Sequence, residues 1–361
     1  MCDTAQPIRC IAHNEGPVGP SSATTDDFRP HGASPDYAPA DSRAPFTAGR
    51  IYPVAFGGRL GYAAHMDDDM TRQQIENNPD IFFFSEHHQE LYEPLCADFG
   101  PVNLSVVHSF AGLMREFLVE ERISGRSLVY YSSTGAAERT NTAFLLASFL
   151  IIDHNMTPEE AWAPFAAIAP PTPDGGILGS EAFETYHDAT FNEKTYGLSV
   201  LACLQGLHRA ISLGWYDALD FNQECYDLLE DPSFAGINVL CPKFVAFKGP
   251  TKKRVRVGEG MYRFPPAHYA QLLRDGLSCA TVVRLNEPTS YDAAEFEDEG
   301  LAHFDLPIAH SALPTRAQVD SFMATCEKQQ GRIAVHCNAG LGRTGTMVAL
   351  YWMKHHGLTA S

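Results

Sequence analysis

A glycine-rich loop near the end of the chain constrains the fold more than any other sequence feature. Residues 335–346 read Val-His-Cys-Asn-Ala-Gly-Leu-Gly-Arg-Thr-Gly-Thr and overlap a short apolar run at 333–335 that predicts a buried strand. Residues 347–354 have the length and composition of a buried helix. A strand, a tight loop and a helix in this order surround one point with backbone N–H groups and a positive helix N-terminus. With Cys337 at one end of the loop and Arg343 at the other, the segment is suited to hold an anion and to attack it.

The residue types in this loop fit the chemistry of a phosphate monoester. Backbone N–H groups can cradle the phosphate oxygens, and the guanidinium of Arg343 can bind two of them as a fork. The same positive groups favour a thiolate at Cys337, which can attack phosphorus and form a phosphocysteine that water then hydrolyses. Thr344 is placed to hydrogen-bond the sulfur and help it leave. The phosphate-binding residues are therefore expected to be Asn338, Ala339, Gly340, Leu341, Gly342 and Arg343.

The spacing of this cysteine and arginine is not specific by itself, because two other pairs share it. Cys203 with Arg209, and Cys326 with Arg332, have the same separation. Both of these cysteines lie in segments with a helical pattern and lack a preceding strand and a glycine-rich loop. A cysteine and an arginine on one helix cannot surround an anion, so we assign the chemistry to Cys337.

The charge of the chain limits its partners. It has 44 Asp and Glu against 26 Lys and Arg in 361 residues, a net charge of −18. This argues against a nucleic-acid-binding protein, whose contact surface is basic, and fits a substrate or partner that is itself basic. Simple solubility is an equally good explanation. The longest apolar run, at 143–152, is too short to span a bilayer, and no Cys or His cluster has zinc-ligand spacing, so neither a membrane contact nor a metal or other cofactor is expected.

The composition also suggests domain boundaries. Residues 1–48 are rich in Pro, Ser, Thr, Ala and Asp, which predicts a disordered arm. Residues 49–221 are expected to form a first domain and residues 238–361 a second, catalytic one. The mixed acidic stretch at 222–237 is expected to link them.

The first domain is expected to repeat the layout of the catalytic loop without its nucleophile. The run at 127–131 predicts a strand, which is followed by a loop of small residues. The next helix contains Arg-Thr-Asn-Thr at 139–142, which resembles Arg-Thr-Gly-Thr at 343–346. In this comparison Tyr131 takes the place of Cys337, and the loop is longer by two residues.

The order of elements in the second domain predicts its fold class. Residues 304–308 predict a strand and 309–314 a loop, after which Thr315 and Gln318 form a capping box at the start of a helix. Strand, loop, helix, strand, loop, helix is an α/β order with a largely parallel sheet, whose ligands bind at the carboxyl ends of the strands. We therefore expect an α/β protein with two tandem domains, each a mostly parallel central sheet flanked by helices.

Taken together, the motifs resemble one family. Residues 335–346 are similar to the signature of the cysteine-dependent dual-specificity protein phosphatases. Segments 97–104, 203–206, 242–247 and 282–286 are similar to the cell-division-cycle-fourteen type, the tandem-domain phosphatases of mitotic exit. The resemblance covers the chain from about residue 49 onward. It implies hydrolysis of phosphoserine, phosphothreonine and phosphotyrosine, and a location in the nucleus and cytoplasm.

The resemblance also implies how a substrate is chosen. It implies a degenerate first domain, an active second domain and a substrate groove between them, with a preference for phosphoserine followed by proline and a basic residue further on. Acidic side chains at the groove would bind that base. We assign this role to Glu159, Glu160 and Asp188.

One departure from the family pattern concerns the general acid. The family places an aspartate in Ile-Asp-Gly-Ser-Thr-Pro before the phosphate loop, where it protonates the leaving oxygen. Residues 309–314 read Ala-His-Ser-Ala-Leu-Pro, so His310 takes that place. Losing a general acid typically costs about 10²–10⁴-fold in rate. A protonated histidine can donate instead, which predicts an activity optimum below neutral pH. The nearest carboxylate, Asp305, corresponds to an aspartate of structural role.

A second departure is the end of the sequence at Ser361, directly after the helix that follows the loop. The family continues with further helices and a glutamine-bearing loop. We therefore expect the second domain to be truncated at its C-terminus and the apolar face of residues 347–353 to be exposed.

Three functions are compatible with these residues. The first is a protein phosphatase in which Cys337 is the nucleophile, Arg343 binds phosphate, Thr344 assists the leaving thiolate and His310 is the acid. The alternative is a catalytically impaired pseudophosphatase that binds phosphoproteins as a scaffold. A sulfurtransferase or arsenate reductase also uses a loop cysteine, but the repeated domain and the arginine after two loop glycines argue against it.

Overall fold

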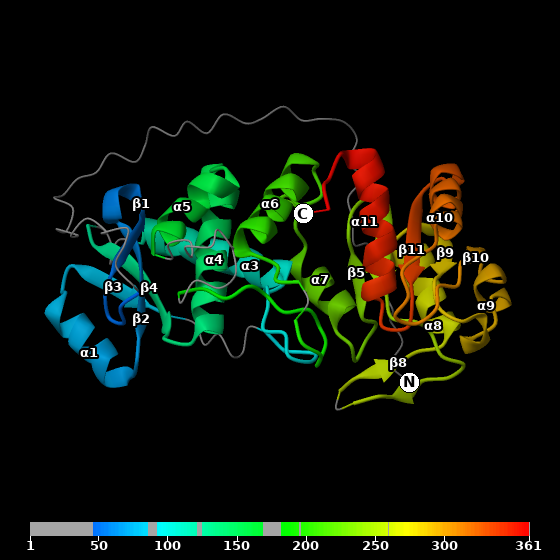
Figure 1. The fold of residues 1–361 in the computed structure, drawn as a ribbon, viewed down its shortest axis with the longest axis horizontal. Helices are drawn as coiled ribbons and strands as arrows, with labels where there is room; N and C mark the ends of the chain where they lie inside the picture. Colours follow the sequence, from blue (N-terminus) through cyan, green and yellow to red (C-terminus); the bar gives the residue numbers. More distant parts are fainter. Residues whose placement is uncertain are drawn as a thin grey trace. The chain divides into compact units, whose positions relative to one another are not determined.

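The structure is a computed structural model that describes residues 46–85, 92–120, 125–168, 182–194, 196–258 and 260–360. The described residues divide into two compact units between Leu219 and Asp220 (Figure 1). The arm expected at 1–48 lies outside the described residues except for its last three, and so does Ser361.

The first unit is built on a four-stranded sheet in the order β1-β2-β4-β3. The edge strand β1 is antiparallel to β2, whereas β4 lies parallel to both β2 and β3. The strands are β1 (Tyr52–Ala55), β2 (Leu60–His65), β3 (Ile81–Phe84) and β4 (Ser127–Ser133).

Helices cover both faces of this sheet. The larger core lies on one face, where Tyr62 and Tyr130 pack among the side chains of α3 to α6. The smaller cluster on the other face includes Ala63 and Val129, and α1 contacts β2 and β3. Because side chains alternate between two covered faces, almost all residues of β2 and β4 are buried. The helices are α1 (Asp68–Asn77), α3 (Leu104–Val119), α4 (Ala136–His154), α5 (Pro158–Ile168) and α6 (Val200–Ser212), with a short turn η1 (Phe56–Gly58).

The second unit has a five-stranded sheet in the order β5-β6-β11-β9-β10. Its edge strand β5 is antiparallel to β6, and the other neighbours are parallel. A separate two-stranded hairpin, β7-β8, projects from the connection after β6. The strands are β5 (Ile237–Val239), β6 (Phe244–Phe247), β7 (Val255–Arg256), β8 (Tyr262–Arg263), β9 (Cys279–Arg284), β10 (Ala302–Asp305) and β11 (Arg332–His336).

This sheet also lies between two layers of helices. On one face Phe244 stacks on Phe322 of α10 and meets Tyr351 of α11 edge to face. On the other face Phe247 packs in a core with Tyr269 of α8. The helical elements are α7 (Gln223–Glu230), α8 (Pro266–Gln271), η3 (Leu272–Gly276), η4 (Pro288–Ser290), α9 (Ala294–Glu297), α10 (Arg316–Lys328) and α11 (Gly342–His356).

The two sheets repeat one strand order. Read from the antiparallel edge, β1-β2-β4-β3 corresponds to β5-β6-β11-β9, and β10 extends the second sheet by one strand. In each unit the third strand of this order leads directly into a long apolar helix, α4 or α11. The prediction of an α/β protein with two repeated units, each a mostly parallel sheet between helices, is confirmed.

Local capping explains where several helices begin. The capping box predicted at Thr315 is present, because its side chain accepts from the Gln318 N–H and the Gln318 carboxamide accepts from the Thr315 N–H. Thr157 and Glu160 form the same arrangement before α5.

Some elements differ from the sequence-based expectation. The segment 222–237, expected as a linker, holds helix α7, which Asn222 caps and whose Leu229 is buried in the second unit's core. This short helix contains four acidic or amide residues, which make its single apolar stripe hard to recognise in the sequence. The strand expected at 304–308 is observed at 302–305, although the N–H groups of Leu306 and Ile308 still donate to carbonyls at the end of β9.

The helix after the loop is more buried than expected. Met347, Val348 and Tyr351 of α11 are buried, so the expectation that this apolar face is exposed is wrong for them. They pack within the second unit, where Tyr351 meets Phe244. Met353, at 37 % exposure, is the part of the predicted face that does reach the surface.

Candidate active site

The predicted strand-loop-helix segment is the centre of the site. Strand β11 ends at His336, Cys337 follows, and α11 begins at Gly342. Because β11 lies between the parallel strands β6 and β9, the loop sits at the edge of the sheet where their carboxyl ends meet. The sequence thus places a nucleophilic side chain at the usual ligand-binding edge of a parallel sheet.

Close backbone contacts fix the path of this loop. Gly340 has φ of +78°, and a Cβ there would lie 2.5 Å from the carbonyl oxygen of Phe247. The N–H of Gly249 donates to the Asn338 carbonyl at 3.1 Å, and a Cβ on Gly249 would lie 2.2 Å from the Cys337 carbonyl oxygen. Glycine is therefore required at both positions for the loop to lie against the end of β6.

The environment of Cys337 favours a thiolate. The residue is only 3 % exposed, and burial alone would raise the pKa of its thiol. Hydrogen bonds from the Thr344 hydroxyl and from the N–H groups of Thr344 and Gly340, together with the charge of Arg343, outweigh burial and lower this pKa below its usual value. The hydroxyl of Thr344 is buried and makes no other hydrogen bond within the described structure. Its role in helping the thiolate leave stays a prediction.

The two other cysteines with the same spacing to an arginine have the opposite environment. Cys203 lies on α6 and Cys326 on α10, as expected from their helical patterns. Burial raises the pKa of each of these thiols to about 12. A buried thiol without anion-stabilising donors stays protonated at neutral pH and is a poor nucleophile.

A pocket of about 340 Å³ opens over the loop. Its walls bring together the nucleophile, the arginine and the candidate acid, three predicted residues that come from two separate segments. Of the predicted phosphate-binding residues, Gly340 and Leu341 do not line the pocket. Gly340 donates its N–H to the Cys337 sulfur, and Leu341 is half-exposed before α11. The lining residues are Ile308, His310, Ser311, Ala312, Leu313, Pro314, Cys337, Asn338, Ala339, Gly342, Arg343 and Thr346.

Arg343 connects the two walls of the pocket. Its guanidinium donates to the Ile308 carbonyl at 2.8 Å and lies 3.7 Å from the carboxylate of Glu287. The side chain of Arg343 is 10 % exposed. Because one guanidinium has five N–H donors in a fixed plane, donors remain for an anion above Cys337.

His310 lines the pocket from the segment between β10 and α10. The residue is exposed, and its Nδ1 is 2.9 Å from the hydroxyl of Ser311. The backbone of Ser311 has φ of +59°. Asp305, the nearest carboxylate in sequence, does not line the pocket. It forms two hydrogen bonds with the buried Arg284, at 2.6 and 3.0 Å, in the structural role expected for it.

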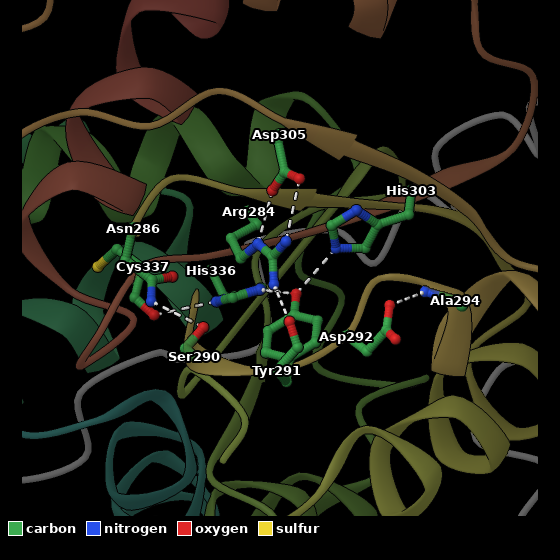
Figure 2. Close-up of polar contacts among 10 residues, drawn as sticks. All are labelled: Arg284, Asn286, Ser290, Tyr291, Asp292, Ala294, His303, Asp305, His336 and Cys337. Atoms are coloured by element: carbon green, nitrogen blue, oxygen red, sulfur yellow. Dashed lines mark hydrogen bonds and ion pairs between the residues drawn. The ribbon is translucent and has the colours of Figure 1, made fainter. Parts of the chain in front are cut away.

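A buried polar network lies behind the loop (Figure 2). His336 Nδ1 is 3.0 Å from the Cys337 carbonyl oxygen, and His336 Nε2 is 2.6 Å from the Tyr291 hydroxyl. The same hydroxyl is 2.9 Å from His303 Nε2. Arg284 donates to the Tyr291 carbonyl at 2.8 Å and lies over the Tyr291 ring, with its guanidinium carbon 4.2 Å from the ring centre. Sequence reasoning missed this network, because its members come from separate strands and share no spacing signal.

The donors and acceptors in this network have one consistent assignment. Burial lowers the pKa of His336 to about 3, so its ring is neutral at physiological pH. A carbonyl can only accept, so Nδ1 carries the ring proton and Nε2 accepts from the Tyr291 hydroxyl. The hydroxyl oxygen then accepts from His303 Nε2, whose ring is also neutral because burial lowers its pKa to about 4.

The corresponding segment of the first unit does not form an anion site. Strand β4 continues through Tyr131 to Ser133, and α4 already begins at Ala136. The expected loop, longer by two residues, is wrong. Ser133 precedes Arg139 by the same six positions as Cys337 precedes Arg343, so Ser133, and not Tyr131, takes the place of the nucleophile.

Arg139 is not available to an anion in this unit. Its guanidinium donates to the Ala182 carbonyl at 2.7 Å and to the Thr134 carbonyl, and it lies over the Phe46 ring at 4.6 Å. Helix α4 also takes up the residues that would make a loop. The first unit therefore keeps the fold of the repeat without a cradle.

The three predicted groove acids all lie in the first unit. Glu159 Oε1 accepts from Gln205 at 2.8 Å, and Glu160 is held by the capping box of α5. Asp188 lies 3.4 Å from His187 Nδ1. Their relation to a substrate stays a prediction.

Two observations bear on a metal site and on a membrane span. Within the described ranges, no group of three or more His, Cys, Asp or Glu side chains could hold a metal ion. No helix in the same part of the chain is long and apolar enough to cross a membrane.

Two protein families match this chain. Residues 56–210 match the family described as dual specificity protein phosphatase, N-terminal half. Residues 266–361 match the DSP-PTPase phosphatase domain described as Swiss Army Knife protein. The first match covers the unit without a cradle, and the second includes the pocket with Cys337.

Individual relatives match across both units. The dual specificity protein phosphatase CDC14A of Mus musculus is 34% identical over 309 residues, which are 84% of this chain and 49% of that protein. The Homo sapiens CDC14A is 32% identical over 309 residues, with 84% and 50% covered. The tyrosine-protein phosphatase CDC14 of Saccharomyces cerevisiae is 29% identical over 330 residues, with 89% and 54% covered.

The chain thus spans about half the length of the curated relatives it matches. The first family match lies within the first unit and the second match within the second unit, and the relatives align with both units. The chain belongs to the CDC14 family of dual specificity protein phosphatases.

Proposed function

We propose that the second unit hydrolyses phosphoserine, phosphothreonine and phosphotyrosine in proteins through a phosphocysteine intermediate. The observation that carries this proposal is the pocket that joins the low-pKa thiol of Cys337 with Arg343. The loop amides from Asn338 to Gly342 and the guanidinium of Arg343 bind the phosphate oxygens. These donors also stabilise the negative charge of the transition state.

The reaction has two steps. The Cys337 thiolate attacks phosphorus, the S–P bond forms, and the P–O bond to the substrate side chain breaks. His310 gives its proton to the departing oxygen, since it lines the same pocket. Water then attacks phosphorus and releases phosphate, and the thiolate leaves with a hydrogen bond from Thr344.

His310 determines how well the enzyme acts on phosphoserine. An alkoxide is a poor leaving group, whereas the phenolate of an aryl phosphate leaves with little help from an acid. We propose that replacement of an aspartate by His310 weakens turnover of phosphoserine more than that of aryl phosphates. The alternative, a phosphoprotein-binding scaffold without turnover, is supported by the same residue.

One assay separates these functions. Purified protein is tested on an aryl phosphate and on a phosphoserine-proline-x-lysine peptide, with Cys337→Ser as control. The proposal predicts hydrolysis of both substrates by the unchanged protein and of neither by Cys337→Ser. His310→Asp should raise turnover of the peptide, and no gain would show that this position is not the acid. Peptide binding without hydrolysis of either substrate would support the scaffold.

A substrate preference is suggested by the resemblance to the family. We propose that substrates carry phosphoserine followed by proline and then a basic residue, which Glu159, Glu160 and Asp188 bind. Glu160 accepts hydrogen bonds from Thr157 and Glu159 accepts one from Gln205, whereas the exposed Asp188 has only the neighbouring His187 beside it at 3.4 Å among the described ion pairs. Replacing lysine by alanine in the peptide should then raise KM, and Asp188→Asn should remove the difference. A location in the nucleus and cytoplasm rests on the family resemblance and stays a prediction.

A further inference from the structure

Two cationic side chains lie beside the phosphate loop and take no part in the reaction described above. Arg263, at the end of β8, donates to the Asn338 side-chain oxygen at 2.7 Å. Asn338 follows the nucleophile and lines the pocket. Lys248 directly follows β6, and its backbone nitrogen lies 3.3 Å from where a Cβ on Gly340 would be. Arg263 therefore contacts a residue that lines the catalytic pocket, and the backbone of Lys248 lies against Gly340 of the same loop.

These two cations are close enough to repel each other. Burial and, after it, the charge of Arg263 lower the pKa of Lys248, and Asp231 offsets this in part. Lys248 and Arg263 are both half-buried, so water screens them less than it screens a surface pair. Placing like charges together costs stability unless an anion joins them.

No carboxylate of the described residues forms an ion pair with either cation, although the charge of Asp231 offsets their repulsion in part. Neither Lys248 nor Arg263 has a salt bridge within 4.0 Å in the part of the chain that the structure describes. Arg263 uses one hydrogen bond to Asn338, and a guanidinium has five N–H donors, so others remain. Half-buried cations with unused donors beside a phosphate pocket form a site for an anion.

The hairpin that carries Arg263 adds further positive charge. Lys252, Lys253, Arg254 and Arg256 are all exposed on or next to β7. Arg254 is held over the Tyr262 ring, with its guanidinium carbon 4.0 Å from the ring centre. In a chain of net charge −18, this local excess of cations opposes the overall charge. Such a patch attracts anionic ligands toward the pocket.

From this arrangement we propose that Lys248 and Arg263 form a second anion subsite, which binds an acidic or phosphorylated residue of the substrate next to the phosphoresidue bound above Cys337. The inference rests on the proposed function, because the subsite binds the substrate peptide that carries the phosphate to be hydrolysed. The contact of Arg263 with Asn338 sets the two anions on neighbouring sides of one loop residue. The subsite is separate from the acids of the first unit, which would bind a base.

The anion that the subsite binds in a substrate peptide can be a side-chain carboxylate or a second phosphate. A guanidinium binds both as a planar fork. A second phosphate carries more charge, so it should bind more tightly and with a steeper dependence on salt.

Binding to Cys337→Ser protein tests the subsite without any need for turnover. Four phosphoserine peptides are compared, with neutral, glutamate, lysine or second phosphoserine residues beside the phosphoserine. We expect the glutamate peptide to bind about fivefold more tightly than the neutral one at low salt, and the doubly phosphorylated peptide more tightly still. The difference should shrink as the salt concentration rises.

A charge reversal makes the test specific. In Arg263→Glu, the order of the peptides should reverse, so that the lysine peptide binds more tightly than the glutamate peptide. Lys328→Glu, the same charge change at the C-terminal end of α10, should leave the order unchanged. The exposed pair of changes Lys252→Ala and Lys253→Ala should reduce the preference for glutamate about twofold, which keeps the test open if Arg263→Glu does not fold.

Three outcomes would overturn the subsite. Equal affinity of the neutral and glutamate peptides is one, and an unchanged order in folded Arg263→Glu protein is another. Binding of an unphosphorylated acidic peptide as tightly as the phosphorylated one would also contradict it, because the hairpin would then bind acidic partners independently of the pocket. Failure of the unchanged protein to hydrolyse any phosphopeptide would contradict the proposed function. The peptide affinities could still be measured, and they would still test the subsite.

Discussion

The Tyr291 hydroxyl lies 2.6 Å from Nε2 of the fully buried His336, and this contact fixes which nitrogen of His336 carries the proton (Figure 2). The protonated Nδ1 then donates a hydrogen bond to the Cys337 carbonyl oxygen, with the two atoms 3.0 Å apart. The backbone of the nucleophile is thus held from below by a neutral imidazole, and the imidazole by a tyrosine more than forty positions earlier in the chain.

Removing the Tyr291 hydroxyl should therefore weaken the catalytic loop. Tyr291→Phe leaves His336 Nε2 buried without its donor, a change that typically costs about 1–3 kcal/mol. We expect faster hydrogen exchange at the amides of β11 and a lower kcat on an aryl phosphate. Tyr351→Phe is the matched control, because the Tyr351 hydroxyl has no hydrogen bond to another described residue. Equal exchange rates in the two variants would contradict the role of Tyr291.

The buried His336 also predicts how stability depends on pH. Its pKa is about 3 in the folded unit, whereas an unfolded histidine titrates near ~6.5. The unfolded chain binds the extra proton between these values, so stability rises with pH across this window and is fully present above ~6.5. Protection of β11 amides should fall as the pH drops from about 6.5 to 4, and His336→Gln should flatten this fall. An identical pH dependence in both proteins would count against the assignment.

Thr344 is expected to control the reactivity of the nucleophile. Its hydroxyl is the first of the hydrogen bonds that lower the pKa of Cys337, so Thr344→Val should raise that pKa. The rate of Cys337 alkylation by iodoacetamide, followed against pH by peptide mass spectrometry, should shift to higher pH. Thr346→Val serves as control, because the Thr346 hydroxyl donates to the Gly342 carbonyl. No difference between the two profiles would exclude this role for Thr344.

Gly340 should tolerate no side chain. Alanine there would combine a φ of +78° with a Cβ 2.5 Å from the Phe247 carbonyl oxygen, which forces the loop away from β6. We expect Gly340→Ala to lose most of its activity on an aryl phosphate. Gly345→Ala places its Cβ in open space within α11 and should keep the fold, with a gain of up to about 1 kcal/mol in stability. Comparable activity of the two variants would show that the loop is not held as described.

The first unit should remain inactive even with a cysteine in place. Ser133→Cys restores the spacing to Arg139, but α4 begins at Ala136 and Arg139 is bound to carbonyl groups. In a Cys337→Ser background this substitution should give no hydrolysis of an aryl phosphate. Measurable turnover that disappears in the Ser133→Ala protein would show that the unit can still form a cradle.

Much of the fold follows from local pattern, because its elements are periodic and strongly apolar. Strand β3 and helix α3 have such sequences, and Asn103 caps α3. β2 was not predicted, since Gly61, Ala63 and Ala64 have weak strand propensity. The antiparallel neighbour β1 and the parallel neighbour β4 stabilise β2 in the sheet, and a local sequence pattern does not reveal such neighbours.

The site divides in the same way. Cys337, Arg343 and Thr344 were predicted from one contiguous motif, and His310 from its place before that motif. Tyr291, His303 and Lys248 were not, because they come from separate segments that only the folded unit brings close to the loop. The misplaced Tyr131 shows the limit of motif comparison, since the structure had to show that β4 continues to Ser133.

The most direct test of the account is to trap the intermediate. Protein mixed with a phosphorylated substrate is quenched in denaturant within milliseconds and digested, and its peptides are analysed by mass spectrometry. The account predicts a phosphoryl group on the peptide that contains Cys337, and none in Cys337→Ser protein. Hydrolysis without this adduct, or hydrolysis retained in Cys337→Ser, would contradict it.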